Sequence, residues 1–298
     1  MRPGDAARLL LLAAVWGGSF AFMRVAVPAL GPLWLAFSRV ALAFIALFAL
    51  SLARRSIPPL SAHWRGYLMI GAVNSALPFA LFCFAEQYIS ASAAAILNAT
   101  SPFFGALIAA LWLGEALTLR KIAGMALGLA GVVVLVGWQP EPLSGMMLWA
   151  TLACLAAALC YGIASVYAKR RMSTSSAMAL YSQLTAAAVL APALLWVPAP
   201  KTLSLLVAAN VLALALASTA FAYLLYFRLI ATIGPARALT VTFLIPLFGV
   251  LWGFVFLGEP LAANMLAGCA LIVAGTWIAA RDARRRTAPQ REGDQEAA

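Results

Sequence analysis

The residue with the clearest chemical potential in this sequence is Arg39, a permanent cation within an apolar run at residues 33–53. A charged side chain in hydrocarbon costs at least about 2.5 kcal/mol, so Arg39 needs a compensating partner. As a functional group, it would hold a substrate carboxylate through two parallel hydrogen bonds. As a structural group, it would pair with carbonyls at a helix end or with Glu86. The sequence leaves both roles open.

Two further groups of side chains fall near the middle of apolar runs and are suited to binding a small molecule. The polar group consists of Asn74, Ser75, Asn98, Ser101, Ser218, Thr219 and Thr242. Such side chains also hydrogen-bond between helices, contributing under about 1 kcal/mol each, so their shared depth is what favours a cavity lining. The aromatic group consists of Trp16, Phe79, Phe82, Tyr161, Tyr181 and Tyr223. Aromatic rings stack on apolar or cationic groups, or fill a core.

We therefore predict a substrate-binding site formed by Trp16, Arg39, Asn74, Phe79, Asn98, Tyr161, Tyr181, Ser218, Tyr223 and Thr242. We do not expect an enzyme, because the apolar runs contain no His, no Asp and no Cys–His or HExxH pattern. The four cysteines are scattered along the chain, which is typical of small packing residues. We expect no catalytic residue, no cofactor and no metal.

The elements that must position these side chains are long apolar segments. Of the 298 residues, 65% are hydrophobic and only 10% are charged, which requires a lipid bilayer around the chain. Runs of roughly 20 apolar residues predict membrane-spanning helices, because barrel strands would alternate apolar and polar residues. The ten runs are 7–28, 33–53, 66–86, 91–113, 119–137, 147–168, 176–197, 203–227, 237–257 and 261–280. The first run lacks a signal-peptide cleavage site, so we interpret it as a helix of the mature protein.

The net charge of +11 does not indicate nucleic-acid binding, because of where the basic residues lie. Most of the 20 Lys and Arg residues fall on one side of the membrane if the N-terminus is cytoplasmic, which is the positive-inside pattern. We expect a multi-pass protein of a bacterial-type inner membrane with both termini in the cytoplasm. Residues 281–298 are predicted to form a basic, disordered tail that contacts anionic lipid.

The chain also contains a repeat at an offset of 144 positions, which pairs Pro102 with Pro246 and Glu115 with Glu259 without a gap. We predict a first five-helix repeat at residues 1–137 and a second at residues 147–280. An odd number of crossings makes the second repeat enter the membrane from the opposite face. Many secondary transporters use such inverted repeats, with the substrate site near the midplane where the repeats meet. The predicted fold class is therefore an all-α integral membrane protein with ten transmembrane helices around a central cavity.

These features resemble the drug/metabolite transporter superfamily, and in particular its EamA type, over residues 8–280. The residues that carry the resemblance are Trp16-Gly17-Gly18-Ser19-Phe20, Phe37-Ser38-Arg39, Pro102 and Pro246 with their closing Leu-Gly-Glu, and Gly124, Gly128, Gly131, Gly268 and Gly275. The resemblance implies ten helices around a central cavity. It also implies export of amino acids or related metabolites.

Alternating access requires helices that bend, and glycine and proline mark where they would do so. The predicted hinges are Gly17, Gly18, Pro78, Pro102 and Pro246. Proline removes a main-chain donor and kinks a helix, which is tolerated inside a bundle where the freed carbonyls line a cavity.

Glu86 is the one carboxylate placed to couple transport to protons, and the offset pairs it with Ile230. Proton pumps usually carry an intramembrane Asp, Glu or His relay, and the only histidine, His63, lies between two runs. Passive facilitation or exchange is therefore favoured over tight proton coupling. Glu115 and Glu259 are expected to share a structural role, pairing with main-chain donors at the start of the next helix.

The predicted function is a secondary transporter that exports a small metabolite, with amino acids, including aromatic or hydrophobic ones, as the favoured substrates. A multidrug or cationic-compound exporter would need a midplane carboxylate, and a nucleoside exporter is a further alternative. A non-transporting membrane scaffold is the alternative from another class. The sequence leaves open whether the protein is a monomer or a homodimer.

Overall fold

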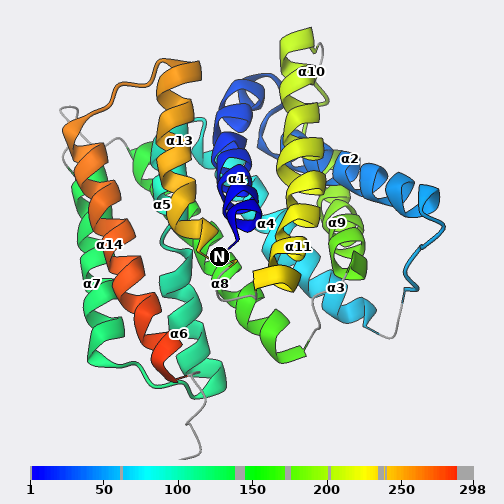
Figure 1. Ribbon diagram of the computed structural model, residues 1–298. Coiled ribbons are helices and arrows are strands. Elements are labelled where there is room, and N and C mark those ends of the chain that lie inside the picture. Colours follow the sequence, from blue (N-terminus) through cyan, green and yellow to red (C-terminus); the bar gives the residue numbers. More distant parts are fainter. Residues whose placement is uncertain are drawn as a thin grey trace, which may run out of the picture.

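The computed structural model describes residues 2–60, 63–137, 145–171, 176–200, 203–233, 238 and 240–286, and the regular secondary structure of these residues is helical throughout. The first half contains α1 (Pro3–Leu30), α2 (Pro32–Ala53), α3 (Trp64–Ile70), η1 (Gly71–Ala76), α4 (Leu77–Ala85), α5 (Ala91–Asn98), α6 (Ser101–Leu113) and α7 (Leu119–Gly137). The second half contains α8 (Gly145–Arg171), α9 (Ser176–Leu190), η2 (Ala191–Trp196), α10 (Leu205–Leu212), η3 (Ala213–Phe221), α11 (Ala222–Ile233), α13 (Val241–Leu257) and α14 (Ala263–Arg286). The helices form one bundle, with α7 and α14 side by side at one edge (Figure 1).

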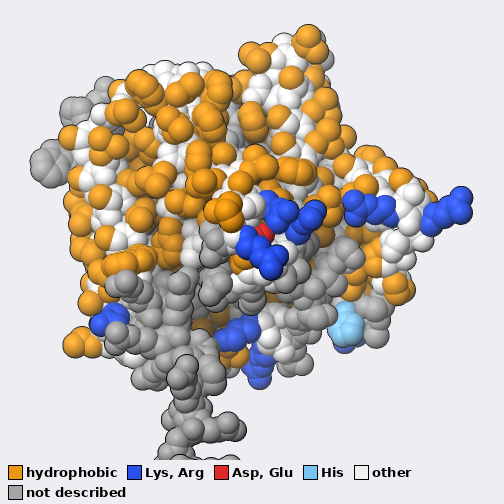
Figure 2. Space-filling model, viewed as in Figure 1, with side chains coloured by type: hydrophobic (Ala, Val, Ile, Leu, Met, Phe, Trp, Pro, Cys, Tyr) orange, Lys and Arg blue, Asp and Glu red, His pale blue; other side chains and the backbone are white. Residues whose placement is uncertain are grey.

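Within the described residues, seven helical segments are long and apolar enough to cross a membrane, judged by length and composition. They are 3–30, 32–53, 64–85, 91–113, 145–170, 177–196 and 205–230. Val241–Leu257 and Ala263–Ile278 are shorter apolar helices, so ten crossings stay a prediction. Many large apolar side chains are exposed, as suits lipid contact, and Figure 2 shows hydrophobic side chains over most of the described surface on one face.

The sequence analysis predicts a basic, disordered tail from residue 281 onward. The prediction is wrong for residues 281–286, because α14 continues to Arg286. Alanine and arginine are strong helix formers, and neither glycine nor proline interrupts residues 279–286. Residues 287–298 lie outside the described part of the chain.

The Leu-Gly-Glu motif ends α6 and α13 in the same way. Gly114 and Gly258 have φ angles of 67° and 65°, a left-handed conformation that glycine adopts at little cost. The next residues, Glu115 and Glu259, donate their main-chain N–H groups to a carbonyl in the last helical turn, at 3.4 and 3.1 Å. The N–H groups of Gly114 and Gly258 point to the same two carbonyls, so the left-handed glycine and the glutamate after it cap each helix end together. The motif thus ends each helix and fixes the position of a carboxylate.

The two halves cross each other at points where glycine lets the main chains approach closely. A Cβ atom added to Gly17 on α1 would lie 2.7 Å from Phe248 Cβ and 2.9 Å from Gly249 N on α13. A Cβ atom added to Gly162 on α8 would lie 2.7 Å from Gly105 N on α6. The sequence offset maps Gly105 onto Gly249. Equivalent surfaces of the two halves therefore make both crossings.

Candidate functional site

Two π-helical segments, η1 and η3, occupy equivalent places in the two halves of the sequence. The first carries Asn74 and Ser75, and the second carries Ser218 and Thr219. The π geometry is rare and appears frequently at functional sites. The Thr219 hydroxyl donates to the main-chain carbonyl of Leu214 at 3.0 Å, which satisfies both groups within the wider turn. Both segments bring polar side chains into the buried interior.

Arg39, on α2, is 4% exposed and has three partners from three other elements. Its Nε donates to Thr219 Oγ1 at 2.9 Å, and its Nη1 lies 3.6 Å from Met23 Sδ. The guanidinium carbon lies 3.6 Å from the centre of the Phe79 ring, a close cation–π contact. The structural role that we considered for Arg39, pairing with the Glu86 carboxylate, is not observed. Neither carboxyl oxygen of Glu86 has a hydrogen-bond partner among the described residues.

Gln183, on α9, is fully buried beside the same π segments. Its Nε2 donates to Ser75 Oγ at 3.2 Å and to Ser182 Oγ at 3.4 Å. Its Oε1 is a buried acceptor that has no hydrogen-bond partner among the described residues. Leaving a buried polar atom unpaired costs about 1–3 kcal/mol, so this oxygen is suited to accept a hydrogen bond from a bound molecule.

The Arg39–Thr219 and Gln183–Ser75 contacts are equivalents of each other. The sequence offset maps Arg39 onto Gln183 and Ser75 onto Thr219. In each contact, a side chain from α2 or α9 reaches a hydroxyl on the π segment of the other half. We call Arg39, Ser75, Phe79, Gln183, Thr219 and Tyr223 the central cluster. We did not predict Gln183 as a site residue, although its pairing with Arg39 by the offset was the signal that would have found it.

Asn74 contacts Tyr223 of the central cluster, and both are predicted site residues. Asn74 Nδ2 donates to the Tyr223 hydroxyl at 2.9 Å. Phe82 packs against Tyr161, with ring centres 6.3 Å apart, and edge-on against Phe20 at 5.4 Å. Because Phe79 and Phe82 are both on α4, the cation of Arg39 lies next to a group of aromatic rings.

Trp16 and Ser218 lie on α1 and η3, two elements that contact each other. The Ser218 hydroxyl donates to the main-chain carbonyl of Val15 at 3.1 Å, one residue before Trp16. The Trp16 ring packs against Tyr226, with ring centres 5.3 Å apart. Trp16 is half-buried and contacts two separate hydrophobic groups of the core.

Two predicted site residues, Tyr181 and Asn98, make their described contacts elsewhere. The Tyr181 hydroxyl donates to the main-chain carbonyl of Pro58, in the connection after α2, so its polar end points away from the central cluster. Asn98, at the end of α5, accepts a hydrogen bond from Ser101 through its side-chain oxygen at 3.3 Å. Thr242 is half-buried on α13.

The predicted hinges lie in different local structures. Pro78 follows the π segment η1, and Pro102 follows a break in the helix between α5 and α6. Pro246 lies inside the continuous helix α13. Gly17 lies at a tight crossing, whereas a Cβ atom on Gly18 would meet only Trp252, at 3.4 Å or more, and Phe22. Their role as hinges stays a prediction.

Glu259 holds the start of α5. Its carboxylate accepts the main-chain N–H groups of Ala91 at 2.7 Å and Ser92 at 3.0 Å, and also the Ser92 hydroxyl. A carboxylate at a helix N-terminus is favoured by the helix dipole. The prediction of a main-chain partner is correct, but α5 belongs to the other half of the sequence and is not the next helix.

Glu115 pairs with lysines in the described part of the chain. It accepts a hydrogen bond from Lys169 Nζ at 3.0 Å and lies 3.6 Å from Lys121 Nζ. The hydrogen bond from Lys169, together with the charges of both lysines, lowers the pKa of Glu115. The offset pairs Ala91 and Ser92 with Pro235 and Ala236, which lie outside the described residues.

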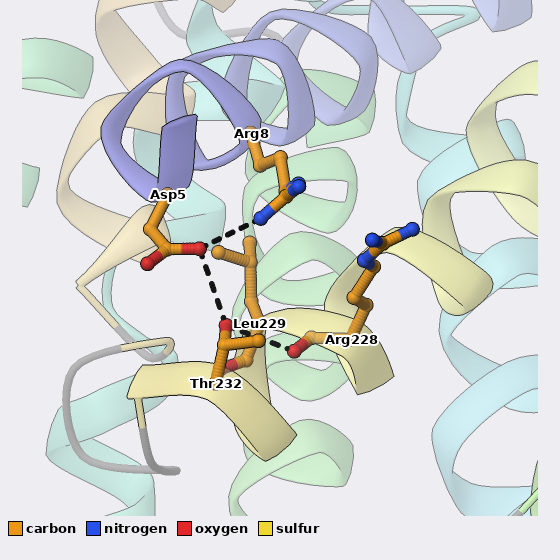
Figure 3. A network of polar contacts seen from close by, with 5 residues as sticks. All are labelled: Asp5, Arg8, Arg228, Leu229 and Thr232. Carbon is orange, nitrogen blue, oxygen red and sulfur yellow. Dashed lines mark hydrogen bonds and ion pairs between the residues drawn. The ribbon is translucent and has the colours of Figure 1, made fainter. Parts of the chain in front are cut away.

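A further polar network ties the start of α1 to the end of α11 (Figure 3). Asp5 Oδ1 accepts hydrogen bonds from Arg8 Nη1 at 2.8 Å and from Thr232 Oγ1 at 3.4 Å. The Thr232 hydroxyl also lies 3.0 Å from the main-chain carbonyl of Arg228. The residues shown interact with one another and have a structural role in joining the two helices.

The described residues contain no group of His, Cys, Asp or Glu that could hold a metal ion. The four cysteines are free thiols, three of them buried. The three buried thiols, Cys83, Cys154 and Cys269, pack in the helical core, in agreement with the sequence analysis.

Comparisons with known proteins place the chain among transporters. The EamA-like transporter family matches residues 6–137 and 148–281. A probable amino-acid metabolite efflux pump of Salmonella typhimurium is 31% identical over 296 residues, covering 93% of this chain and 95% of that protein. An S-adenosylmethionine/S-adenosylhomocysteine transporter of Chlamydia trachomatis is 28% identical, covering 90% of this chain and 86% of that protein. A solved crystal structure covering 96% of this chain has a TM-score of 0.66 at 22% identity, which shows the likeness of fold alone.

Proposed function

This chain belongs to the EamA-like transporter family, and we propose that it exports amino acids across a bacterial inner membrane by alternating access. It is a membrane transporter of the EamA type and not an enzyme. The proposal concerns its substrate, its organisation and the residues that bind the substrate.

The central cluster is the observation that carries the proposal. Arg39 provides a buried cation for a carboxylate, and Gln183 Oε1 provides a buried acceptor for an ammonium group. Phe79, which covers one face of Arg39, and its neighbour Phe82 would receive an apolar or aromatic side chain. A zwitterion with such a side chain is complementary to this arrangement in charge and polarity. Relatives named as amino-acid efflux pumps support the same substrate class.

The pairing of equivalent residues supports an organisation as two inverted five-helix repeats, 1–137 and 147–280. Arg39 and Gln183 each reach a hydroxyl of the opposite half, as expected for residues around a pseudo-two-fold axis. Ten crossings, with both termini in the cytoplasm, are part of the same proposal, and the distribution of Lys and Arg supports them.

The alternatives differ in the groups that they require at the centre. A cationic drug would need an acidic partner, but the side chains hydrogen-bonded to Arg39, Gln183 and Asn74 are neutral in the described residues. A nucleoside exporter would use the aromatic rings and would not need Arg39. Each alternative therefore predicts its own pattern of mutant phenotypes.

Counterflow in proteoliposomes tests the proposal. Vesicles preloaded with mixed amino acids would be offered each radiolabelled amino acid, with and without a proton gradient. We expect accumulation that persists without the gradient and falls about 10–100-fold in Arg39→Gln, the loss of a charge-assisted bond worth about 1.5–3 kcal/mol. Tyr181→Phe is the matched control, because its hydroxyl bonds Pro58, away from the cluster. If folded wild-type protein accumulates no amino acid, the substrate assignment is wrong.

A further inference from the structure

Glu86 is the most anomalous side chain in the described part of the chain. It is the residue that follows α4, and its exposed fraction is 0%. Neither of its carboxyl oxygens has a hydrogen-bond partner among the described residues. An ionised carboxylate in such surroundings would lose its hydration without compensation, whereas the neutral acid would lose far less.

The charged neighbours of Glu86 do not form an ion pair with it. Arg24, on α1, donates a hydrogen bond to the main-chain carbonyl of Glu86 and not to its carboxylate. Arg39, on α2, is engaged with Thr219 and Phe79.

The other titratable groups near Glu86 are the carboxylate of Glu259 at the end of α13 and the thiols of Cys83 on α4 and Cys154 on α8. Of these, Glu259 carries the nearby negative charge, and like charges at short range disfavour a second ionised carboxylate. The two arginines act in the other direction, but without a direct hydrogen bond to the Glu86 carboxylate.

Glu86 is enclosed at the end of the bundle where α4 ends, α5 begins and α13 ends, which we call the α4–α5 end. Here the Glu259 carboxylate holds the first residues of α5, Ala91 and Ser92. Gly253 on α13 makes this approach possible, because a Cβ atom there would clash with Ser92 Oγ and the Glu259 carboxylate. Separation of α5 from Glu259 would admit water to the region around Glu86.

We propose that Glu86 is a proton-binding site that is occupied while the α4–α5 end is closed and that releases its proton when this end opens. The closed form then binds one more proton than the open form. By linkage, the closed form is stabilised at low pH, and this stabilisation is lost as pH rises through the value at which the closed form releases the proton. The proton would set the conformational balance of the carrier without being carried across the membrane. Only this effect on transport rests on the proposed function; the proton site itself does not.

Infrared spectroscopy of the purified full-length protein in lipid nanodiscs tests the site without any transport. We expect the carbonyl absorbance of a protonated carboxylic acid near neutral pH in the wild type. The absorbance should disappear in Glu86→Gln and remain in Glu115→Gln, whose carboxylate is paired with lysines. An unchanged spectrum in Glu86→Gln would mean that Glu86 is ionised, and the proposal would be overturned. Glu86→Met is a second neutral variant of similar length, should Gln disturb folding.

Hydrogen–deuterium exchange of residues 90–98 tests the link to opening. After correction for the intrinsic exchange rate, one linked proton raises the opening constant by up to about tenfold per pH unit in the wild type. We expect this dependence to vanish in Glu86→Gln and to persist in Glu115→Gln. Equal pH dependence in wild type and Glu86→Gln would refute the linkage. Both measurements remain valid if the protein carries no amino acid, so failure of this proposal and failure of the proposed function are distinguishable.

Discussion

At the scale of single residues, Arg39 and Gln183 occupy equivalent positions of the sequence repeat but differ in charge and in hydrogen-bonding groups. Each reaches a hydroxyl of the opposite half, but only Arg39 carries a charge, and only Gln183 has an unpaired acceptor. In the proposed substrate site, this asymmetry provides a cation for a carboxylate and an uncharged acceptor oxygen for an ammonium group. Two unlike groups can orient a zwitterion, which a strictly symmetric site cannot do.

Gln183→Met should therefore weaken the recognition of compounds with an ammonium group more than the recognition of compounds that lack one. The variant removes the Oε1 acceptor while keeping the length of the side chain. We expect amino-acid counterflow to fall about 10–100-fold, since a hydrogen bond to a charged group is worth about 1.5–3 kcal/mol. Inhibition of counterflow by the corresponding carboxylic acid without an amino group should change less than threefold, roughly half a kcal/mol at most. Equal losses for both compounds would show that Gln183 has only a structural role.

The contribution of Glu115 to the stability of the fold should depend on pH as expected for an exposed ion pair. Its lowered pKa, caused first by the Lys169 hydrogen bond, means that the folded state binds the proton less tightly than the unfolded state. The pair thus stabilises the fold at neutral pH, and this contribution is lost as pH falls through the folded-state pKa. Because Glu115 and Lys169 are partly exposed, Glu115→Gln should cost about 0–1 kcal/mol at neutral pH. Thermal unfolding in detergent at neutral and acidic pH would measure this, and a loss above about 2 kcal/mol would contradict it.

At the scale of elements, the contact of α7 with α14 relies on glycines in equivalent positions. A Cβ atom on Gly131 would lie 2.9 Å from the carbonyl oxygen of Gly268, and one on Gly275 would lie 2.4 Å from that of Gly124. The offset maps Gly124 onto Gly268 and Gly131 onto Gly275, so each of the two contacts is the equivalent of the other in the repeat. Small residues that allow main chains to approach are a common basis of helix association in membranes.

Gly131→Leu should therefore separate α7 from α14. We expect a destabilisation of about 2–4 kcal/mol, because overpacking costs typically 1–3 kcal/mol and the obstacle here includes main-chain atoms. Gly145→Leu is the matched control, since a Cβ atom there meets nothing within 4 Å. Thermal unfolding followed by fluorescence size-exclusion chromatography would compare the two. Similar stabilities would show that the helices adjust to the larger side chain.

The elements were predictable from the sequence to different degrees. The continuous apolar runs located the helices, and Gly114 and Gly258 in the repeated Leu-Gly-Glu motif explain why two of them end where they do. The π segments were not predictable, because the residue types in them are equally compatible with an α-helix and leave no pattern of their own. The direction of the Tyr181 side chain was not predictable for a related reason. The sequence indicated its depth along the helix, but its hydroxyl points to the main-chain carbonyl of Pro58.

At the scale of the whole molecule, the contact of Glu259 with α5 closes one end of the bundle. The proposed alternating access predicts an equivalent contact at the other end in the opposite conformation. In an inverted repeat, the opposite conformation would form the equivalent contact between Glu115 and the residues paired with Ala91 and Ser92. Those residues are Pro235 and Ala236, so the sequence offers no N–H at the first position and no hydroxyl at the second. The two closed ends are thus unequal in hydrogen bonds, and the conformation with the α4–α5 end closed should be favoured at rest.

Two substitutions at opposite ends should therefore shift the carrier in the same direction. Ser92→Ala removes the hydroxyl donor to Glu259, and Ala236→Ser supplies its counterpart for Glu115. We expect each to favour opening of the α4–α5 end by about 1 kcal/mol, or about fivefold in the ratio of the two conformations.

Electron-spin distance measurements between labels at Tyr88 and Leu261, both exposed near this end, would report the two populations. A shift with Ser92→Ala alone would mean that the α4–α5 contact is a local lock, whereas a shift with both would require the ends to exchange. No shift with either would show that the hydroxyl contact does not set the balance, because the Glu259 carboxylate would then hold α5 through its main-chain N–H groups alone.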